Sequence, residues 1–83
     1  MKQYFVRTVN DHPLEFYRLL FQFKYAIVSK DVIYSGTVII AEKDVNGNWG
    51  INYLSKLPEW VKEITADLFK VIEENELQQL SRF

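Results

Sequence analysis

The sequence contains no cysteine, one histidine, two prolines and three glycines. Without cysteine the chain can form neither disulfides nor thiolate metal sites, which argues against a disulfide-stapled secreted miniprotein. The only histidine, His12, follows Asp11 in a turn, and no plausible nucleophile stands beside this pair. The three glycines form no phosphate-binding loop. We therefore expect no catalytic residues, no metal site and no cofactor, and predict that the protein is not an enzyme.

Long apolar runs and an excess charge of one sign are also missing. The longest uninterrupted apolar runs are only a few residues long, which is too short to cross a membrane. The first residues, MKQYFVRTV, include Gln3 and Arg7 and lack the apolar core of a signal peptide. The formal net charge of −1 indicates neither affinity for nucleic acid nor its absence. By elimination, we expect a cytoplasmic protein without membrane contact.

Apolar and aromatic residues, by contrast, are abundant. Hydrophobic residues make up 48% of the chain, and two Trp, five Tyr and six Phe are present. This composition is unlike that of a disordered chain. The 83 residues suffice for one small domain and leave no room for a second. A chain of this size buries only about 60–65% of its unfolded surface, so we expect modest stability unless something else covers apolar area.

The stretch from Leu19 to Tyr53 carries the strand signals. Apolar and polar residues alternate there, and β-branched and aromatic residues dominate, as in half-buried strands. Asn46-Gly47 indicates a two-residue hairpin turn, which places Ile40 opposite Tyr53. Lys30-Asp31, taken as the centre of the preceding turn, places Ile27 opposite Tyr34. Both turns put apolar residues on the same face, and this agreement supports the predicted register.

The beginning of the chain predicts another strand. Residues 2–9 alternate, and residues 10–13, Asn-Asp-His-Pro, form a turn cluster. The LEFYRLLFQF segment that follows is compatible with a short helix over 13–20 or with a backward extension of the next strand. We favour the strand, because a four-residue turn then pairs Tyr4 with Leu19 and keeps the apolar side chains on one face.

This register divides the sheet residues between two faces. Face A contains Tyr4, Val6, Leu19, Phe21, Phe23, Tyr25, Ile27, Tyr34, Val38, Ile40, Trp49, Ile51 and Tyr53. Face B contains Phe5, Arg7, Val9, Leu14, Phe16, Arg18, Leu20, Gln22, Lys24, Ala26, Val28, Ile33, Thr37 and Ile39.

A helix is predicted from Pro58 to about Asn75. Proline is tolerated in a first turn, where its missing donor is not needed. The apolar stripe is formed by Trp60, Val61, Ile64, Leu68, Val71 and Ile72, which fall within about 120° of one another. We expect this stripe to cover face A. Leu77, Leu80 and Phe83 are out of phase with it, so the domain is predicted to span 1–76, with 77–83 as an arm or fraying tail.

Together these elements predict an α+β two-layer sandwich. An antiparallel β-meander of about four strands is covered on one face by a C-terminal helix, in the order ββββα. One helix cannot cover both faces, and an exposed face B would be a larger apolar patch than soluble monomers usually tolerate.

We therefore expect face B to be an interface, most simply in a homodimer. The predicted function is a small non-catalytic protein–protein interaction module that self-associates through the second face of its sheet. The predicted interface residues are Phe5, Arg7, Leu14, Phe16, Arg18, Leu20, Lys24, Ile33 and Ile39.

Two alternatives remain open. Aromatic residues beside Arg7, Arg18 and Lys24 suggest single-stranded nucleic-acid binding, although the chain is not basic and lacks a ribonucleoprotein motif. The predicted helix also carries a ridge of carboxylates, which suggests a small phage-type inhibitor directed at a basic site on a host or partner protein. A solvated helix face explains the same ridge. This acidic ridge consists of Glu59, Glu63, Asp67 and Glu74.

Overall fold

The computed structural model describes residues 3–19, 23–31, 33, 37–52 and 58–80. These residues form an antiparallel sheet of five strands in sequence order, followed by one helix. The elements are β1 (Tyr4–Val9), β2 (His12–Arg18), β3 (Lys24–Ser29), β4 (Val38–Lys43), β5 (Trp49–Asn52) and α1 (Glu59–Leu80). The expected α+β meander with a C-terminal helix is confirmed, with five strands in place of about four.

The additional strand comes from a reversal of the chain between β2 and β3. The Leu19 amide donates to the Lys24 carbonyl at 3.0 Å, and Leu14 pairs with Ser29 across the two strands. The segment predicted as one continuous strand is therefore two strands lying side by side. The preference for strand over helix at 13–20 is nevertheless confirmed as far as Arg18, where β2 ends.

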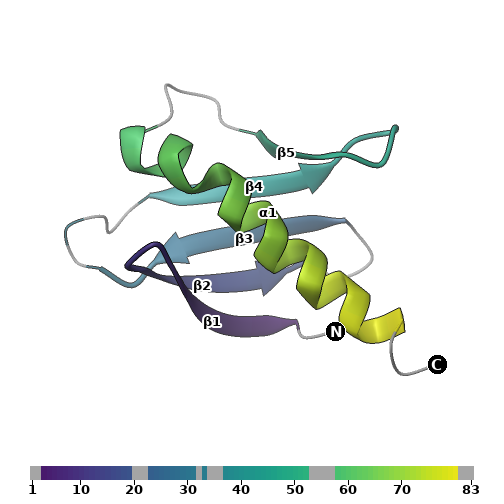
Figure 1. The fold of residues 1–83 in the computed structure, drawn as a ribbon, viewed down its shortest axis with the longest axis horizontal. Helices are drawn as coiled ribbons and strands as arrows, with labels where there is room; N and C mark the ends of the chain where they lie inside the picture. Colours follow the sequence, from purple (N-terminus) through teal and green to yellow (C-terminus); the bar gives the residue numbers. More distant parts are fainter. Residues whose placement is uncertain (1–2, 20–22, 32, 34–36, 53–57, 81–83) are drawn as a thin grey trace.

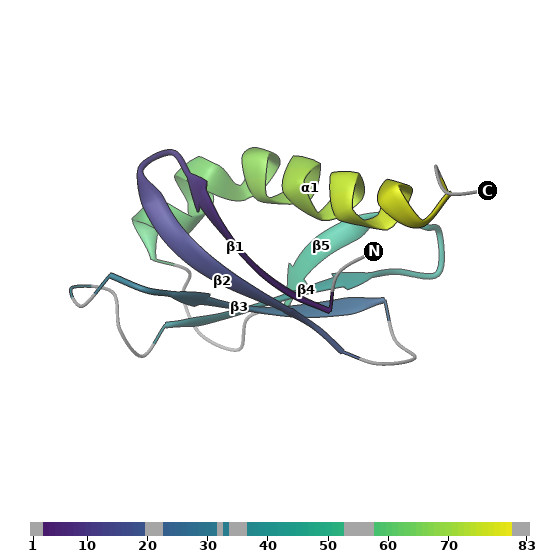
Figure 2. The same cartoon turned by 90° about the horizontal axis from the view of Figure 1, so that it is seen from below.

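Helix α1 runs diagonally across one face of the sheet (Figure 1). Viewed along the sheet, the helix lies on one side and the β1–β2 hairpin rises toward it (Figure 2). We call the side beneath α1 the inner face and the opposite side the outer face. The structure thus has two layers, the sheet and helix α1, and the helix covers one side of the sheet.

The β1–β2 turn has two residues. Asn10 and Asp11 both have positive φ, 47° and 68°, which is the conformation of a type I′ hairpin turn. Val9 therefore pairs with His12, and Tyr4 with Tyr17. The predicted four-residue turn, which paired Tyr4 with Leu19, was too long by two residues. A shift of two leaves each side chain on the same face.

The β4–β5 loop is one residue longer than predicted. The Gly47 amide donates to the Asp44 carbonyl at 3.0 Å, and the Asp44 amide donates to the Asn48 carbonyl at 2.9 Å. With Gly47 at φ 85°, this is a three-residue loop that ends in a left-handed glycine. Lys43 consequently pairs with Trp49, and the predicted pairing of Ile40 with Tyr53 is wrong.

The predicted β3–β4 register is also wrong. Ile27 pairs with Ile39 and not with Tyr34, which lies outside the described residues. Because an odd shift moves side chains to the other face, the predicted faces A and B are mixed across the observed sheet. Face A coincides with the inner face in β3 and β5, and face B coincides with it in β1, β2 and β4.

Helix α1 starts after Pro58, whose carbonyl accepts from the amides of Val61 and Lys62. It continues to Leu80, so the predicted end at Asn75 is wrong. Asn75 is buried, and its amide donates to the Tyr25 hydroxyl at 2.8 Å. Of the predicted arm at 77–83, residues 77–80 belong to the helix and 81–83 lie outside the described residues.

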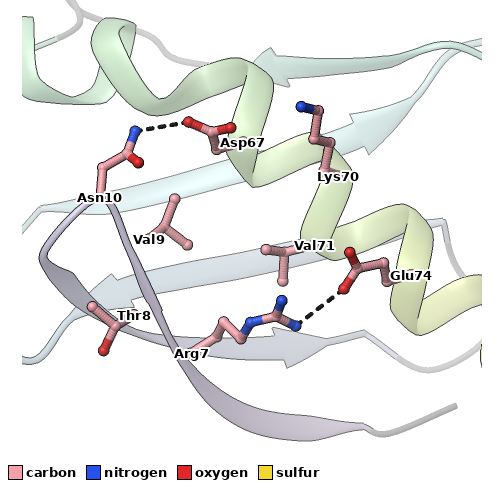
Figure 3. A pocket seen from close by; sticks show the side chains of 8 residues that line it. All are labelled: Arg7, Thr8, Val9, Asn10, Asp67, Lys70, Val71 and Glu74. Atoms are coloured by element: carbon pink, nitrogen blue, oxygen red, sulfur yellow. Dashed lines mark hydrogen bonds and ion pairs between the residues drawn. The ribbon is translucent and has the colours of Figure 1, made fainter.

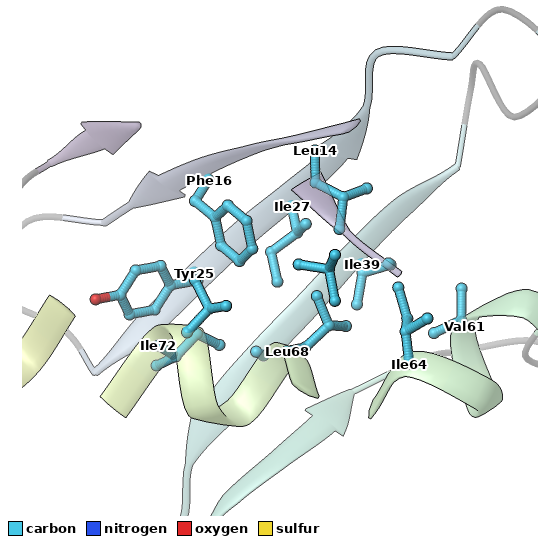
Figure 4. Packing of buried hydrophobic residues seen from close by; sticks show 12 residues of the cluster. Leu14, Phe16, Tyr25, Ile27, Ile39, Val61, Ile64, Leu68 and Ile72 are labelled. Carbon is cyan, nitrogen blue, oxygen red and sulfur yellow. The ribbon is translucent and has the colours of Figure 1, made fainter. Parts of the chain in front are cut away.

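The core lies between α1 and the inner face (Figure 4). The predicted helix stripe is confirmed, with Val61, Ile64, Leu68 and Ile72 almost completely inaccessible. Each such side chain contributes about 1.5–3 kcal/mol when fully buried. The sheet contributes Val9, Leu14, Phe16, Tyr25, Ile27, Ile39 and Ala41. The core thus draws on residues of both predicted faces, and the expectation that α1 covers face A alone is wrong.

Candidate interaction surface

The outer face carries a group of partly exposed apolar and aromatic side chains. Tyr4, Val6 and Tyr17 are 49%, 47% and 40% exposed, and Val38 is 46% exposed. Ala26, Val28 and Ile40 lie among them and are half-buried. The strand pairings place all seven on one side of the sheet. No described element covers this side (Figure 2). These seven side chains therefore form an apolar surface that the described fold leaves open.

Three side chains form a polar cluster within this surface. The hydroxyls of Tyr4 and Tyr17 both donate to Oε2 of Glu15, at 2.9 and 2.7 Å. The two tyrosine rings lie 4.9 Å apart and are tilted by 43°. The hydrogen bonds lower the pKa of Glu15, that from Tyr17 most and then that from Tyr4, with a further contribution from Lys30. The cluster therefore holds an ionised carboxylate in one orientation at neutral pH.

One ion pair borders the same surface. Lys24 Nζ lies 3.4 Å from Oε2 of Glu42, and both side chains are about one-third exposed. The two residues face each other across β3 and β4. With Glu15, the outer face thus presents charges of both signs around an apolar centre.

Three predicted interface residues belong to the core. Leu14, Phe16 and Ile39 are fully buried on the inner face. Phe5, also predicted for the interface, is half-buried and stacks on Phe16 at 4.7 Å. The prediction that these residues share an uncovered face is wrong, because the true strand pairings turn them toward α1.

The remaining predicted interface residues do not lie together. Arg7 and Arg18 point from the inner face toward carboxylates of α1. Lys24 is on the outer face, beside Glu42. Ile33 is 82% exposed in the β3–β4 connection, and Leu20 lies outside the described residues.

Arg18 anchors a network between the sheet and the second half of α1. Its Nε and the terminal nitrogen Nη2 donate to Oε2 and Oε1 of Glu76, at 2.9 and 3.1 Å. The Tyr25 hydroxyl donates to the same carboxylate at 2.6 Å and accepts from Asn75. Burial raises the pKa of Glu76, but the hydrogen bonds from Arg18 and Tyr25 outweigh it and leave that pKa below its ordinary value. Burial, followed by the bond to Glu76, raises the pKa of Tyr25.

The acidic ridge is divided between internal contacts and solvent. Asp67 accepts from Asn10 at 2.7 Å, and Glu74 pairs with Arg7 at 3.1 Å (Figure 3). All four of these residues line a cavity of about 220 Å³ between β1 and α1. Glu63 is exposed, and Glu59 lies 4.0 Å from Lys62. Half of the ridge therefore fastens α1 to the edge of the sheet.

A second cavity, of about 340 Å³, lies between the β4–β5 hairpin and α1. Trp49 forms an aromatic wall and meets Tyr25 edge-on at 5.6 Å. The cavity is lined by Lys43, Gly47, Trp49, Glu73, Glu76 and Leu77. Glu76 belongs to the Arg18 network, so this carboxylate is already engaged within the chain.

The remaining chemistry of the described residues is sparse. His12 stacks on the half-buried Trp60 at 4.7 Å, which is a packing contact between β2 and the first turn of α1. Within residues 3–19, 23–31, 33, 37–52 and 58–80, no three His, Asp or Glu side chains are grouped so that they could hold a metal ion. Helix α1, the one helix in this part of the chain, is not apolar enough to cross a membrane.

Sequence reasoning placed Tyr4, Val6 and Val38 beneath the helix, on face A, and did not identify Glu15 and Tyr17 as surface residues. A signal was present in β2, whose sequence HPLEFYR alternates between strongly apolar Leu14 and Phe16 and the more polar Glu15 and Tyr17. That alternation predicts that the side chains of Leu14 and Phe16 point toward the core.

Comparison of the chain with models of known protein families, with curated proteins and with solved structures found no match in any of the three.

Proposed function

We propose that this protein is a small non-catalytic protein–protein interaction module that self-associates through the outer face of its sheet. The observation that supports this most directly is the exposure of Tyr4, Val6, Tyr17 and Val38 on one continuous side. Tyrosine is enriched at interfaces because its ring gains from burial while its hydroxyl keeps a polar partner.

The size of this surface predicts weak association. Four strands spaced by about 4.8 Å, each about 20 Å long, give a footprint of roughly 400 Å² in projection. Standard interfaces bury about 800 Å² of accessible surface on each partner, and smaller ones are typically transient. We therefore expect a homodimer with a dissociation constant in roughly the micromolar range.

The charges of the outer face are compatible with a second copy. Lys24 and Glu42 balance each other, and Glu15 lies close enough to Lys30 for that ammonium to lower its pKa. Two copies of such a face do not repel each other by net charge. A two-fold dimer uses one self-complementary surface, and two sheets pack face to face at about 10 Å.

The nucleic-acid alternative has less support. It depends on three cations on one face, but Arg7 and Arg18 pair with carboxylates of α1 on the inner face, whereas Lys24 lies on the outer face. The use of the acidic ridge against a basic site of a host or partner protein stays a prediction, as does a cytoplasmic location.

Sedimentation equilibrium of the whole chain tests the proposal. Val38→Lys places a charge on the outer face and should shift the chain to monomer at roughly 50 µM, a concentration at which a micromolar dimer is largely assembled. Val45→Lys is the matched control, because Val45 is fully exposed in the β4–β5 loop. It should leave the association unchanged. A wild-type chain that stays monomeric at several times this concentration would contradict the proposal.

A further inference from the structure

The two described hydrogen bonds of the tyrosine–carboxylate cluster go to a single oxygen of Glu15. Tyr4 and Tyr17 both donate to Oε2 of Glu15, while Oε1 accepts no hydrogen bond from the described part of the chain. If the outer face is buried in a dimer, this carboxylate is buried with it. The charge of Lys30 lowers the pKa of Glu15, but among the described residues no cation forms an ion pair with this carboxylate. A buried carboxylate without an ion-pair partner is costly, and two hydroxyls on one oxygen do not replace that partner. The interface therefore needs a cation in direct contact with Glu15.

The strand pairings indicate which cation is placed to supply it. Tyr4, Tyr17, Ala26 and Ile40 lie opposite one another on β1 to β4 and form a row across the outer face. Glu15 precedes Tyr17 by two residues, and Lys24 precedes Ala26 by two. Because β2 and β3 are antiparallel, Glu15 and Lys24 lie on opposite sides of this row, each about 7 Å from it.

A two-fold axis along the row exchanges its two sides. In a face-to-face pair of sheets, the axis lies in the plane between them, and each side of the row faces the other side of the second copy. We propose that Glu15 of one protomer forms an ion pair with Lys24 of its partner, twice in each dimer. This inference rests on the proposed function and specifies how the two copies are oriented.

The contacts that Lys24 and Glu15 form within one chain leave both residues able to pair with a second protomer. The Lys24–Glu42 pair is long, at 3.4 Å, and both side chains remain about one-third exposed, so Lys24 can bridge Glu42 and a second carboxylate. Glu15 is already oriented by the two tyrosines, which reduces the entropy lost when its partner binds. A charge pair placed between two sheets is also less screened by salt than one on the surface.

Charge exchange tests the pairing directly. Glu15→Lys and Lys24→Glu, made separately, should each weaken dimerisation about tenfold or more, since each removes two contacts in a symmetric dimer. The double variant Glu15→Lys with Lys24→Glu should return the dissociation constant to within about threefold of wild type. Sedimentation equilibrium measures the constants, and far-UV circular dichroism verifies that every variant folds.

The control uses the other cation near Glu15. Lys30 acts on Glu15 within one chain, so Glu15→Lys with Lys30→Glu restores the internal attraction but not the contact between copies. This variant should remain as weak as Glu15→Lys alone. Glu15→Gln adds a second measurement, because it keeps an acceptor for the tyrosines but removes the charge, and should also weaken the dimer.

Two outcomes would overturn the inference while leaving the proposed function intact. In the first, the wild type dimerises and Val38→Lys breaks the dimer, but Glu15→Lys with Lys24→Glu dimerises no better than Glu15→Lys alone. In the second, Glu15→Lys with Lys30→Glu restores dimerisation as well as Glu15→Lys with Lys24→Glu does. That result would assign the effect to a contact within one chain. A wild type that never associates would overturn both proposals together.

Discussion

The inner and outer faces are built from neighbouring residues of the same strands, yet their surroundings differ. In β2, Phe16 is fully buried against α1, whereas the next residue, Tyr17, is 40% exposed on the other side. The centre of the inner face holds fully buried Leu14, Phe16 and Ile27, and its polar groups, such as the Arg18 guanidinium, pair with side chains of α1. The outer face combines tyrosine and valine, which tolerate water but gain from partial burial, with the charged side chains of Glu15, Lys24 and Glu42. The outer face thus differs both from a core and from a fully solvated surface.

The charged groups show the same contrast. The Arg18–Glu76 pair has side chains only 10% and 19% exposed, and its bidentate geometry and the Tyr25 hydroxyl satisfy both carboxylate oxygens. The Arg7–Glu74 pair joins the same helix to the sheet, but its side chains are 50% and 57% exposed. A shielded, bidentate pair constrains geometry, while an exposed single contact contributes little.

The largest expected effect comes from removing a ring from the inner face. Phe16→Ala should lower the free energy of unfolding by about 3–5 kcal/mol, because it leaves a cavity between Phe5, Ile27 and the helix. Tyr17→Ala, one residue further along β2, should cost clearly less, because it removes mainly the ring contact with Tyr4 at the exposed outer face. Urea unfolding at protein concentrations below association measures both. Equal costs would mean that the two faces are not distinguished by burial as described.

The Arg18 network should produce the next largest effect. Glu76→Gln should lower the free energy of unfolding by about 2 kcal/mol, since it leaves the shielded Arg18 guanidinium without its counter-charge. Glu74→Gln is the matched control in the neighbouring exposed pair and should cost below about 0.5 kcal/mol. Urea titrations at neutral pH compare them. A cost for Glu74→Gln as large as that for Glu76→Gln would contradict the distinction between the two pairs.

The same carboxylate predicts a pH dependence. The pKa of Glu76 in the folded chain lies below its ordinary value of 4.5, so its stabilising contribution is present above about pH 4.5 and is lost as the pH falls. The wild type should therefore lose stability in acid more steeply than Glu76→Gln. Some slope should persist in the variant, because the pKa of Glu15 is lowered as well. Thermal unfolding between about pH 2.5 and 7 measures the two slopes; parallel curves would exclude this role of Glu76.

Much of this architecture was predictable from the sequence. The strands, the C-terminal helix and its apolar stripe follow from local periodicity, which the tertiary structure did not override. The distribution of residues between the two faces was not predictable in the same way. In β4, Val38, Ile39, Ile40 and Ala41 are all apolar, so alternation cannot indicate which of them point inward.

In this part of the sheet, the lengths of the hairpin loops determine which side chains lie on which face. The predicted turns before and after β4 were both displaced by an odd number of residues, and the two errors cancel for β5 but invert β4. The agreement of two turns therefore gave false support to the register. The residues of the candidate surface were misassigned for two reasons. These loop lengths placed Val38 and Ile40 of β4 on the wrong face, and the missed chain reversal between β2 and β3 did the same for the residues of β1 and β2.

The variant with the smallest expected effect, Gly47→Ala, tests the β4–β5 loop directly. Gly47 has φ 85°, and a Cβ added there would meet only the Lys43 side chain, at an ordinary 3.8 Å. Gly47→Ala should therefore cost about 1 kcal/mol, for conformational reasons and not for steric ones. Gly50→Ala is the matched control, because an added Cβ meets nothing within 4 Å and Gly50 does not have positive φ. It should be neutral or slightly stabilising in urea titration. If Gly47→Ala were equally neutral, the left-handed glycine would not be what fixes the three-residue loop, and with it the face on which Trp49 and Ile51 lie.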